Sequence, residues 1–555
     1  MTITDPPEQP SASRVEPVPA GLIASIPERA GTDVRAALEH GNIGEAVAAA
    51  VATGDLSLAV DVVRVGWFAL LHDDRRDSVR QTLDQLSTAQ LMAHPLLAMA
   101  LGLVYNADGA RRSKAIYYFG LAAAGVRNRP GRLSPAERAL VLTSESAALR
   151  LMGKTSLSVS SARAGLQALE AIHEGRSELI GYLPRLYAQL GTSLFYGGQE
   201  AEALHMFARG FAEAGPSDRS SFGNLAMSAG IHALAGNLAE AGDRVLAARG
   251  EPWTDEQRCM YVGTFYRIAE AVLALERFDV VQAQRHLDMM KHDRRSIEHW
   301  AVIARVQALT TLLAGDASRA LVELEEYAVL RGGEGDTKVA RQRLCSMRSL
   351  LHIALGNYEA ASTVLRSDGG NSPQDHVDRA RLALATDRIG EVYKELRAIA
   401  GRPQSVRTSA EALSVEAAAG LRAGADRRTM AVVRQLASLL RHSDQRIALH
   451  LLPPDDVDSI RRTLEGIGAH DVLEPAPCEP VLIQPDRPVL TPRELAVLNA
   501  LARSSAVGDI AAELFVSTNT VKSQLRSLYR KLGARNRDEA LAVALHRHLI
   551  SAAEI

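Results

Sequence analysis

The residues best suited to chemistry lie near the carboxyl end of the chain, in the run from Thr520 to Gly533. Read as a helix, this run has one apolar stripe, formed by Val521, Leu525, Leu528 and Leu532. The opposite face carries cations and hydrogen-bonding groups: Asn519, Lys522, Ser523, Arg526 and Arg530. A short helix with an apolar back and a cationic front has the form that enters the major groove of DNA. The run therefore predicts contacts with phosphates and base edges.

Helix signals on both sides of this run predict the elements that position it. Thr491, Pro492 and Glu494 form a capped helix start in which Glu494 completes a capping box. A second short helix is expected at residues 510–514, and Ser517 is placed to cap the third. Gly533 suits the end of that third helix, and residues 536–539 repeat the capping-box pattern before a fourth. Four short helices, the third basic and exposed, form a helix-turn-helix module.

These residues resemble the LuxR-type helix-turn-helix domain of bacterial transcription regulators. The segments LTPRELAVLNALA, DIAAELFVS and NTVKSQLRSLYRKLG, followed by RDEA from Arg537, match its pattern in order and spacing. The resemblance implies that bases are contacted by Lys522, Ser523 and Arg526. It implies that Thr518, Asn519 and Thr520 lie near phosphates, and Arg530, on the cationic face of the same helix, is expected to contact the DNA backbone as well. It also implies that the fourth helix packs against a second copy, for which the candidate residues are Leu541, Ala544 and Leu545.

The segment departs from that family at a few positions. Ser504, Ala506 and Gly508 stand where the family usually has Gly, a capping Ser and a polar or basic residue, so the second helix is expected to start less firmly. Residues 490–555 contain nine Lys plus Arg and six Asp plus Glu, a net charge of +3. Because so small an excess binds DNA weakly, a homodimer on paired half-sites is expected. The alternative is a small helical bundle whose basic face is only solvated.

The length and composition of the whole chain limit its possible domain organisation and location. Its 555 residues are 47% hydrophobic, which indicates several domains or a repeat array. The net charge is −2, so basicity is local, and the three cysteines lie far apart, as expected in a reducing cytosol. No run approaches the length of a membrane span, and residues 1–30 lack a secretory pattern and are predicted to be a flexible tail. A cytoplasmic, nucleoid-associated protein is therefore expected.

Residues 31–450 are predicted to be helical throughout, and one short sequence motif recurs in them. A glycine, usually followed by a polar residue, precedes an alanine by five positions at Gly41, Gly54, Gly198, Gly236, Gly315 and Gly356. Glycine suits the tight turn between two antiparallel helices, and alanine lets the second helix lie close to the first. This motif predicts an all-α fold, with a degenerate tetratricopeptide-like solenoid of helical hairpins ahead of the four-helix module.

This middle region is similar to the solenoid of the large maltose-regulator-like LuxR proteins, most clearly from Gly54 to Leu86. In that family the solenoid links a sensing ATPase to the DNA reader, and solenoids offer a concave binding surface. Two interpretations stay open. In the first, the solenoid senses an unknown effector or protein partner. In the second, it only separates and dimerises the DNA-binding domains. Residues 451–488, rich in proline and acids, are predicted to be a linker, and residues 489–555 to be the DNA-binding domain.

Other candidate sites are weaker. Gly153, Lys154 and Thr155 look like the end of a phosphate-binding loop, but the residues before them read as a helix, so an inter-helix turn is expected and the ATPase is missing. Three nearby histidines lack the spacing that puts two metal ligands on one helix face: His286, His292 and His299. The tryptophans are interpreted as core anchors: Trp67, Trp253 and Trp300. No enzymatic activity, metal or cofactor is expected.

The sequence thus predicts a sequence-specific transcription regulator. Its partners would be double-stranded promoter DNA, a second copy of the chain, an effector or protein at the solenoid, and RNA polymerase. No membrane partner is expected. The alternative is a helical-repeat interaction scaffold whose C-terminal domain is masked or binds protein.

Overall fold

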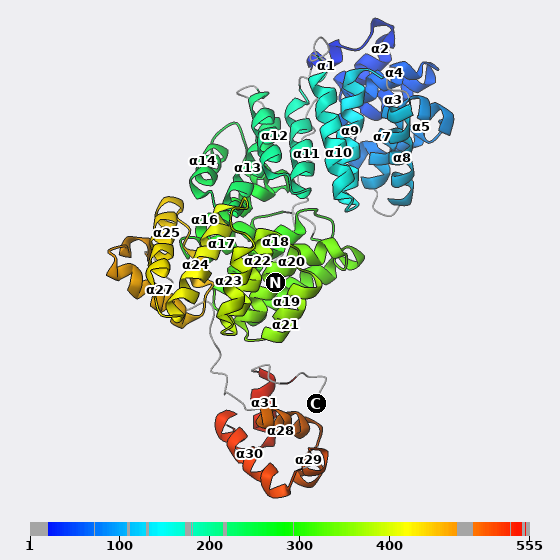
Figure 1. Ribbon diagram of the computed structural model, residues 1–555. Helices are drawn as coiled ribbons and strands as arrows, with labels where there is room; N and C mark the ends of the chain where they lie inside the picture. The colour runs from blue at the N-terminus through cyan, green and yellow to red at the C-terminus, as the bar shows by residue number, and fades with distance from the viewer. Residues whose placement is uncertain are drawn as a thin grey trace, which may run out of the picture. The chain divides into compact units, whose positions relative to one another are not determined.

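The structure is a computed structural model, and it describes residues 20–70, 73–107, 112–128, 133–172, 179, 181–214, 219–291, 294–473, 492–504, 506–514, 516–532, 534–546 and 550. Every regular element in these residues is a helix, which confirms the all-α prediction (Figure 1). The chain divides into two units, one of Met1–Ser228 with Ala248–Thr254 and the other of Ala229–Ala247 with Asp255–Ile555.

The first unit contains α1 (Ala20–Ala24), α2 (Gly31–Glu39), α3 (Ile43–Ala52), α4 (Leu56–Val65), α5 (Asp73–Leu83), α6 (Thr88–Ala93), α7 (Pro95–Ala107), α8 (Arg112–Asn128), α9 (Pro135–Leu151), α10 (Thr155–Glu170), α11 (Leu183–Tyr196) and α12 (Glu200–Ala212). The division between the units runs through α13 (Phe222–Ala235) and α14 (Leu238–Arg249). Consecutive helices pack as hairpins, as in α7/α8, α9/α10 and α11/α12.

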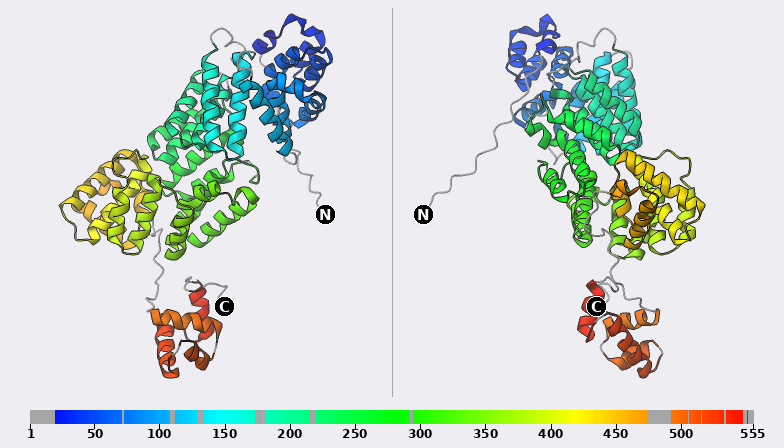
Figure 2. Two further views of the ribbon diagram at one scale, coloured as in Figure 1. Left: turned by 45° about the vertical axis from the view of Figure 1, so that its right-hand side comes forward. Right: turned by 90° about the vertical axis from the view of Figure 1, so that its left-hand side faces the viewer.

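The second unit continues with α15 (Asp255–Cys259), α16 (Thr264–Leu275), α17 (Val280–Asp288), α18 (Trp300–Leu313), α19 (Ala317–Leu330), α20 (Lys338–Ala354), α21 (Tyr358–Ser367), α22 (Pro373–Ala385), α23 (Ile389–Arg397), α24 (Val406–Arg422), α25 (Arg427–Ser443), α26 (Ile447–His450) and α27 (Pro454–Gly466). Hairpins recur here from α16/α17 to α24/α25, and Figure 2 shows them from two directions. The chain then forms a separate core from α28 (Pro492–Arg503), α29 (Val507–Glu513), α30 (Thr518–Leu532) and α31 (Arg537–His546).

Short 3-10 helices complete the described elements: η1 (Glu28–Ala30), η2 (Trp67–Ala69), η5 (Arg219–Ser221), η6 (Tyr261–Gly263), η7 (Gly332–Glu334) and η8 (His470–Leu473).

The recurring glycine-to-alanine motif forms the predicted inter-helix turn at all six of its positions. All six glycines adopt positive φ, between 69° and 90°. All six alanines that follow are 0% exposed: Ala46, Ala59, Ala203, Ala241, Ala320 and Ala361. The polar residue after the glycine caps the next helix where it is Asn42, Asp55 or Asp316. The hairpin solenoid is therefore encoded locally, turn by turn.

Two predicted boundaries are wrong. Residues 20–30 of the predicted tail form α1 and η1, and Leu22 is 0% exposed. Residues 451–473 of the predicted linker belong instead to the helical region, where α27 and η8 pack on α24 and α25 and where Ile460 and Leu464 are both 0% exposed. Pro454 occupies the first position of α27, where its missing N–H costs nothing, so this proline starts a helix. Residues 474–488 of the predicted linker lie outside the described residues.

Within the second unit, Glu276 joins helices that are far apart in sequence. Its carboxylate accepts hydrogen bonds from the backbone N–H of Arg446 at 2.8 Å and of Ile447 at 3.1 Å, at the start of α26. It also pairs with Arg407 Nη1 at 2.7 Å, and Arg407 Nε donates to the carbonyl of Leu234 at 3.0 Å. A simple solenoid has contacts only between neighbouring repeats. These hydrogen bonds therefore add long-range connections to the stacked hairpins.

The imidazole of His450, at the end of α26, makes the stability of the second unit dependent on pH. It is 8% exposed, and its ring centroid lies 4.8 Å from that of Phe278. Burial, together with the charge of Arg461, lowers its pKa from 6.5 to about 4. Because the folded-state pKa lies below the unfolded one, the unfolded chain takes up the proton first. The stabilising contribution is complete above pH 6.5 and is lost as the pH falls toward 4.

We expect this residue to lower the free energy of unfolding by about 2 kcal/mol between about pH 7 and pH 5. In His450→Phe, which keeps an aromatic ring against Phe278, that part of the pH dependence should be absent. Urea unfolding of both proteins at the two pH values measures it. An identical pH dependence in the two proteins would show that His450 does not keep a lowered pKa in the folded state.

Candidate nucleic-acid interface

α30 has the amphipathic form that the sequence predicts. Its apolar stripe is buried, with exposed fractions of 0% for Val521, 9% for Leu525, 0% for Leu528 and 2% for Leu532. These side chains meet α28 and α29 in one core. The seven residues predicted to contact DNA are all exposed on this helix: Thr518, Asn519, Thr520, Lys522, Ser523, Arg526 and Arg530. The core therefore fixes which face of α30 points outward.

The cations on the outer face have no side-chain partner among the residues that the structure describes. Lys522, Arg526 and Arg530 recur every fourth residue and so lie side by side along the helix. None of them forms a hydrogen bond or an ion pair with any residue that the structure describes, whereas Lys531, elsewhere on the helix, donates to Glu494 at 2.7 Å. A row of such cations raises the local positive potential. An anionic partner can occupy this face without breaking a contact within the protein.

The start of α30 is a capped helix N-terminus. Ser517 caps the helix as predicted, because the backbone N–H of Thr520 donates to its hydroxyl at 3.1 Å. A helix N-terminus carries free N–H groups and a partial positive charge, which together attract phosphate. Thr518 and Asn519 lie in this first turn and are exposed. Both side chains therefore face solvent beside the N-terminus of the helix.

Glu494 has a role that sequence reasoning missed. Its carboxylate is 3% exposed and accepts hydrogen bonds from Ser527 and from Lys531 on α30, both at 2.7 Å. This buried network ties α28 to the helix that carries the exposed cations. Arg537 makes a similar connection from α31, donating to the carbonyl of Leu501 at 3.1 Å. Residue types alone gave no signal for either pairing. Thr491 and Gly533, expected to cap α28 and to end α30, lie outside the described residues.

α29 begins three residues earlier than predicted and starts without a side-chain cap at Ala506, in line with the expected weaker start. The loop before it is held in another way. Ser504 donates its hydroxyl proton to Asp509 at 3.0 Å and accepts a hydrogen bond from the N–H of Ala506 at 3.2 Å. An ion pair between Arg503 and Glu513 links α28 to the end of α29. α29 is thus anchored to α28 despite the missing cap.

The dimer residues expected on α31 need correction. Leu541 is 6% exposed and Ala544 is 0% exposed, since both pack into the core of their own domain. A side chain buried in this way cannot also form a surface for a second copy. The side chain of Leu545 lies outside the described residues, and the exposed residue next to Leu541 on this helix is Ala542. Helix periodicity alone does not say whether an apolar stripe covers its own core or a partner.

The weaker sequence candidates are structural where the structure describes them. Gly153 forms the turn between α9 and α10 with φ of 71°, as expected of an inter-helix turn. Among the described residues, no three His, Cys, Asp or Glu side chains gather as metal ligands. Trp67 and Trp300 are core residues, 4% and 1% exposed, whereas Trp253 is only half-buried and lies against Phe211 and Phe222. His292 lies outside the described residues.

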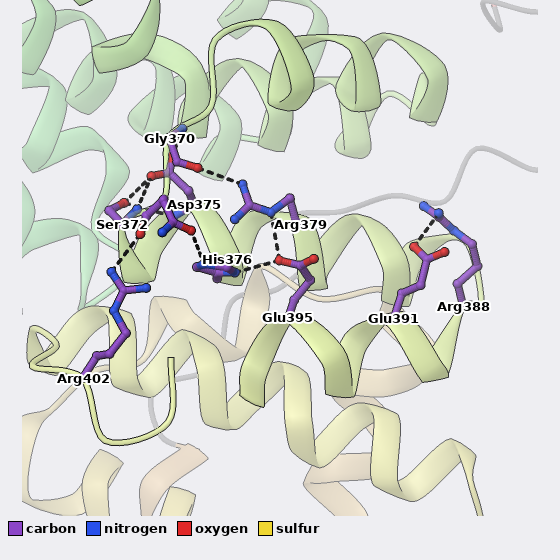
Figure 3. Close-up of polar contacts among 10 residues, drawn as sticks. Gly370, Ser372, Asp375, His376, Arg379, Arg388, Glu391, Glu395 and Arg402 are labelled. Atoms are coloured by element: carbon purple, nitrogen blue, oxygen red, sulfur yellow. Dashed lines mark hydrogen bonds and ion pairs between the residues drawn. The ribbon is translucent and has the colours of Figure 1, made fainter. Parts of the chain in front are cut away.

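A dense polar cluster at the α22/α23 hairpin is likewise satisfied internally (Figure 3). His376 contacts Glu395 through Nδ1 at 2.7 Å and Asn371 through Nε2 at 2.8 Å, and Arg379 donates to Glu395 at 2.9 Å. Asp375 lies in the capping box of Ser372 and accepts the N–H of Gly370 at 3.1 Å. These polar groups hold the hairpin together.

Comparison with known proteins agrees with the geometry of the C-terminal helices. Residues 488–544 match the family described as bacterial regulatory proteins, luxR family. The group of α28, α29, α30 and α31 is therefore a LuxR-type helix-turn-helix domain. No helix within the described ranges has both the length and the apolar character needed to cross a bilayer.

Curated relatives extend this comparison. The probable transcriptional regulatory protein NarL of Mycobacterium tuberculosis (strain ATCC 25618 / H37Rv) is 44% identical over 66 residues, 12% of this chain and 31% of that protein. The HTH-type transcriptional regulator MalT of Serratia proteamaculans (strain 568) is 25% identical over 295 residues, 49% of this chain and 30% of that protein. The second similarity reaches beyond the DNA-binding domain, which confirms the resemblance to maltose-regulator-like proteins. The chain spans about a third of the length of these relatives, 31% and 30%.

Proposed function

We propose that this protein regulates transcription by binding promoter DNA through α30 and by receiving a signal or a partner on its helical hairpins. The observation that carries the proposal is the row of cations Lys522, Arg526 and Arg530 on an exposed helix face, where they have no partner in the described part of the chain. In this proposal Lys522, Ser523 and Arg526 read bases. The DNA backbone is held by Thr518, Asn519, Thr520 and Arg530. The relatives support this function, because the matched proteins are named as transcriptional regulators.

The low charge of the domain supports binding as a homodimer. A net charge of +3 over residues 490–555 gives one domain little electrostatic affinity, and paired half-sites double the number of contacts. The dimer surface would involve exposed positions of α31 such as Ala542. RNA polymerase is a further partner in this proposal. The site of action is the bacterial cytoplasm, where the DNA lies.

Lys522→Ala and Arg526→Ala test the base-reading role. If each side chain contacts base edges, each substitution should weaken specific binding by about 1–3 kcal/mol. A binding site selected from random duplex DNA with the full-length chain serves as the probe, and dissociation constants are measured at one fixed salt concentration.

Arg535→Ala is the matched control, because it removes the same charge from an exposed position of the same domain outside α30. Its effect should be smaller, and it should weaken all DNA sequences alike. Unchanged affinity in both α30 variants, or an equal loss in the control, would refute the assigned role.

A further inference from the structure

A long groove lies along α8, α9 and α10 in the first unit. It has a volume of about 800 Å³ and is lined by one stripe of residues from each helix. Small side chains widen it, among them Gly120 and Ala123 on α8, Ala148 on α9 and Ala164 on α10. Figure 1 shows the three helices next to one another. This volume lies within the range of about 300–1,000 Å³ that is usual for small-molecule sites.

One end of the groove is apolar and exposed. Ile116 is 51% exposed, Met152 is 37% exposed and Leu157 is 58% exposed, and all three line the groove. Such large apolar side chains are normally buried, and a cluster of them next to a groove marks a binding surface. This end therefore favours an apolar part of a ligand.

The middle of the groove is polar but internally paired. Glu145 is 5% exposed, and its carboxylate accepts hydrogen bonds from Arg127 and from Ser161, each at 2.5 Å. Because the charges of Arg127 and Glu145 neutralise each other, this pair does not require a charged group on a ligand.

The other end carries a cation that has no such partner. Arg138 lines the groove from the first turn of α9 and is half-buried, and its guanidinium makes no hydrogen bond or ion pair with any residue in the described ranges. Along α9 it lies about 21 Å from Met152, at 1.5 Å per residue. A planar guanidinium binds carboxylates and other oxyanions through paired hydrogen bonds. The groove is thus apolar at one end and cationic at the other.

We propose that this groove binds an amphiphilic anion, with its carboxylate or sulfonate head at Arg138 and its apolar chain running along the groove toward Ile116, Met152 and Leu157. If the hairpins receive a signal, as proposed above, this site identifies the chemical class of the signal molecule as an amphiphilic anion. The binding itself needs no DNA, so it stands or falls separately from the proposed regulatory function.

Calorimetric titration of the full-length chain with decanoate tests the proposal. Decanoate should bind, and decyltrimethylammonium, which has the same chain length and a cationic head, should bind at least about tenfold more weakly. Arg138→Gln should weaken decanoate binding by about tenfold while leaving decyltrimethylammonium unchanged. Equal binding of the two probes, or no effect of Arg138→Gln, overturns the proposal.

Gly120→Leu blocks the groove without disturbing the fold. A Cβ at Gly120 would meet nothing within 4 Å, and helical glycine is a poor helix former, so the variant should fold at least as stably. It should lose decanoate binding. Gly242→Leu, on α14 and equally unobstructed, is the matched control and should bind normally. Decanoate binding that survives in Gly120→Leu, or that is absent from the natural protein, leaves the groove to another occupant and overturns the proposal.

Discussion

Truncating Leu528 to alanine is expected to unfold the C-terminal domain and to abolish DNA binding by the full-length chain. The side chain is 0% exposed in the core that α28, α29, α30 and α31 share. Removing a buried leucine costs about 2–5 kcal/mol, through lost transfer free energy and the cavity left behind. A core of this small size supplies about 3–5 kcal/mol of net stability, so the loss removes most of it.

Limited proteolysis of the full-length chain measures this effect, since an unfolded C-terminal domain is cut first. Val516→Ala removes methyl groups from a side chain that is 41% exposed in the turn before α30, and it should change the stability by less than about 0.5 kcal/mol. The helical hairpins should unfold as in the natural protein in both variants. Normal DNA affinity together with normal protease resistance in Leu528→Ala would contradict the assignment of this residue to the core.

Replacing Arg381 with alanine is expected to destabilise the second unit by about 3–5 kcal/mol. Its guanidinium is 2% exposed and pairs with Asp378 at 2.9 Å and with Glu411 at 2.6 Å, which are themselves 1% and 7% exposed. Without Arg381, two buried carboxylates lose their direct partner. Burial already raises the pKa of Asp378 even though Arg381 opposes this shift. The variant must therefore either keep uncompensated charges or take up protons.

Chemical denaturation followed by circular dichroism gives the size of this effect. Arg388→Ala removes an exposed ion pair, with side chains 47% and 54% exposed, from the same α22/α23 hairpin and should cost only about 0–1 kcal/mol (Figure 3). Adding Asp378→Asn and Glu411→Gln to Arg381→Met should recover part of the stability, because neutral amides then replace the two buried carboxylates. The recovery should stay partial, because the buried guanidinium of Arg305 also faces these two carboxylates. A loss in Arg381→Ala no larger than in Arg388→Ala would mean that water reaches the cluster in solution.

The sequence by itself determined the features that depend on local periodicity and turn chemistry. The positive φ at Gly41, Gly54 and the later copies follows from glycine in a tight turn. The burial of Val521 and Leu528 follows from the helical repeat, and so does the exposure of Lys522 and Arg526. Each of these needs only a few neighbouring residues to specify it.

Tertiary structure decided what depends on a distant partner. Pro454 starts a helix because α24 and α25 offer a surface for α27, and Leu541 is a core residue because α31 folds back onto its own domain. Glu494 and Glu276 find their partners 37 and 170 residues away in sequence. The groove that Arg138 lines exists because α8, α9 and α10, from two hairpins, lie side by side. A pattern along the chain specifies which face of a helix is apolar, but only packing specifies what that face meets.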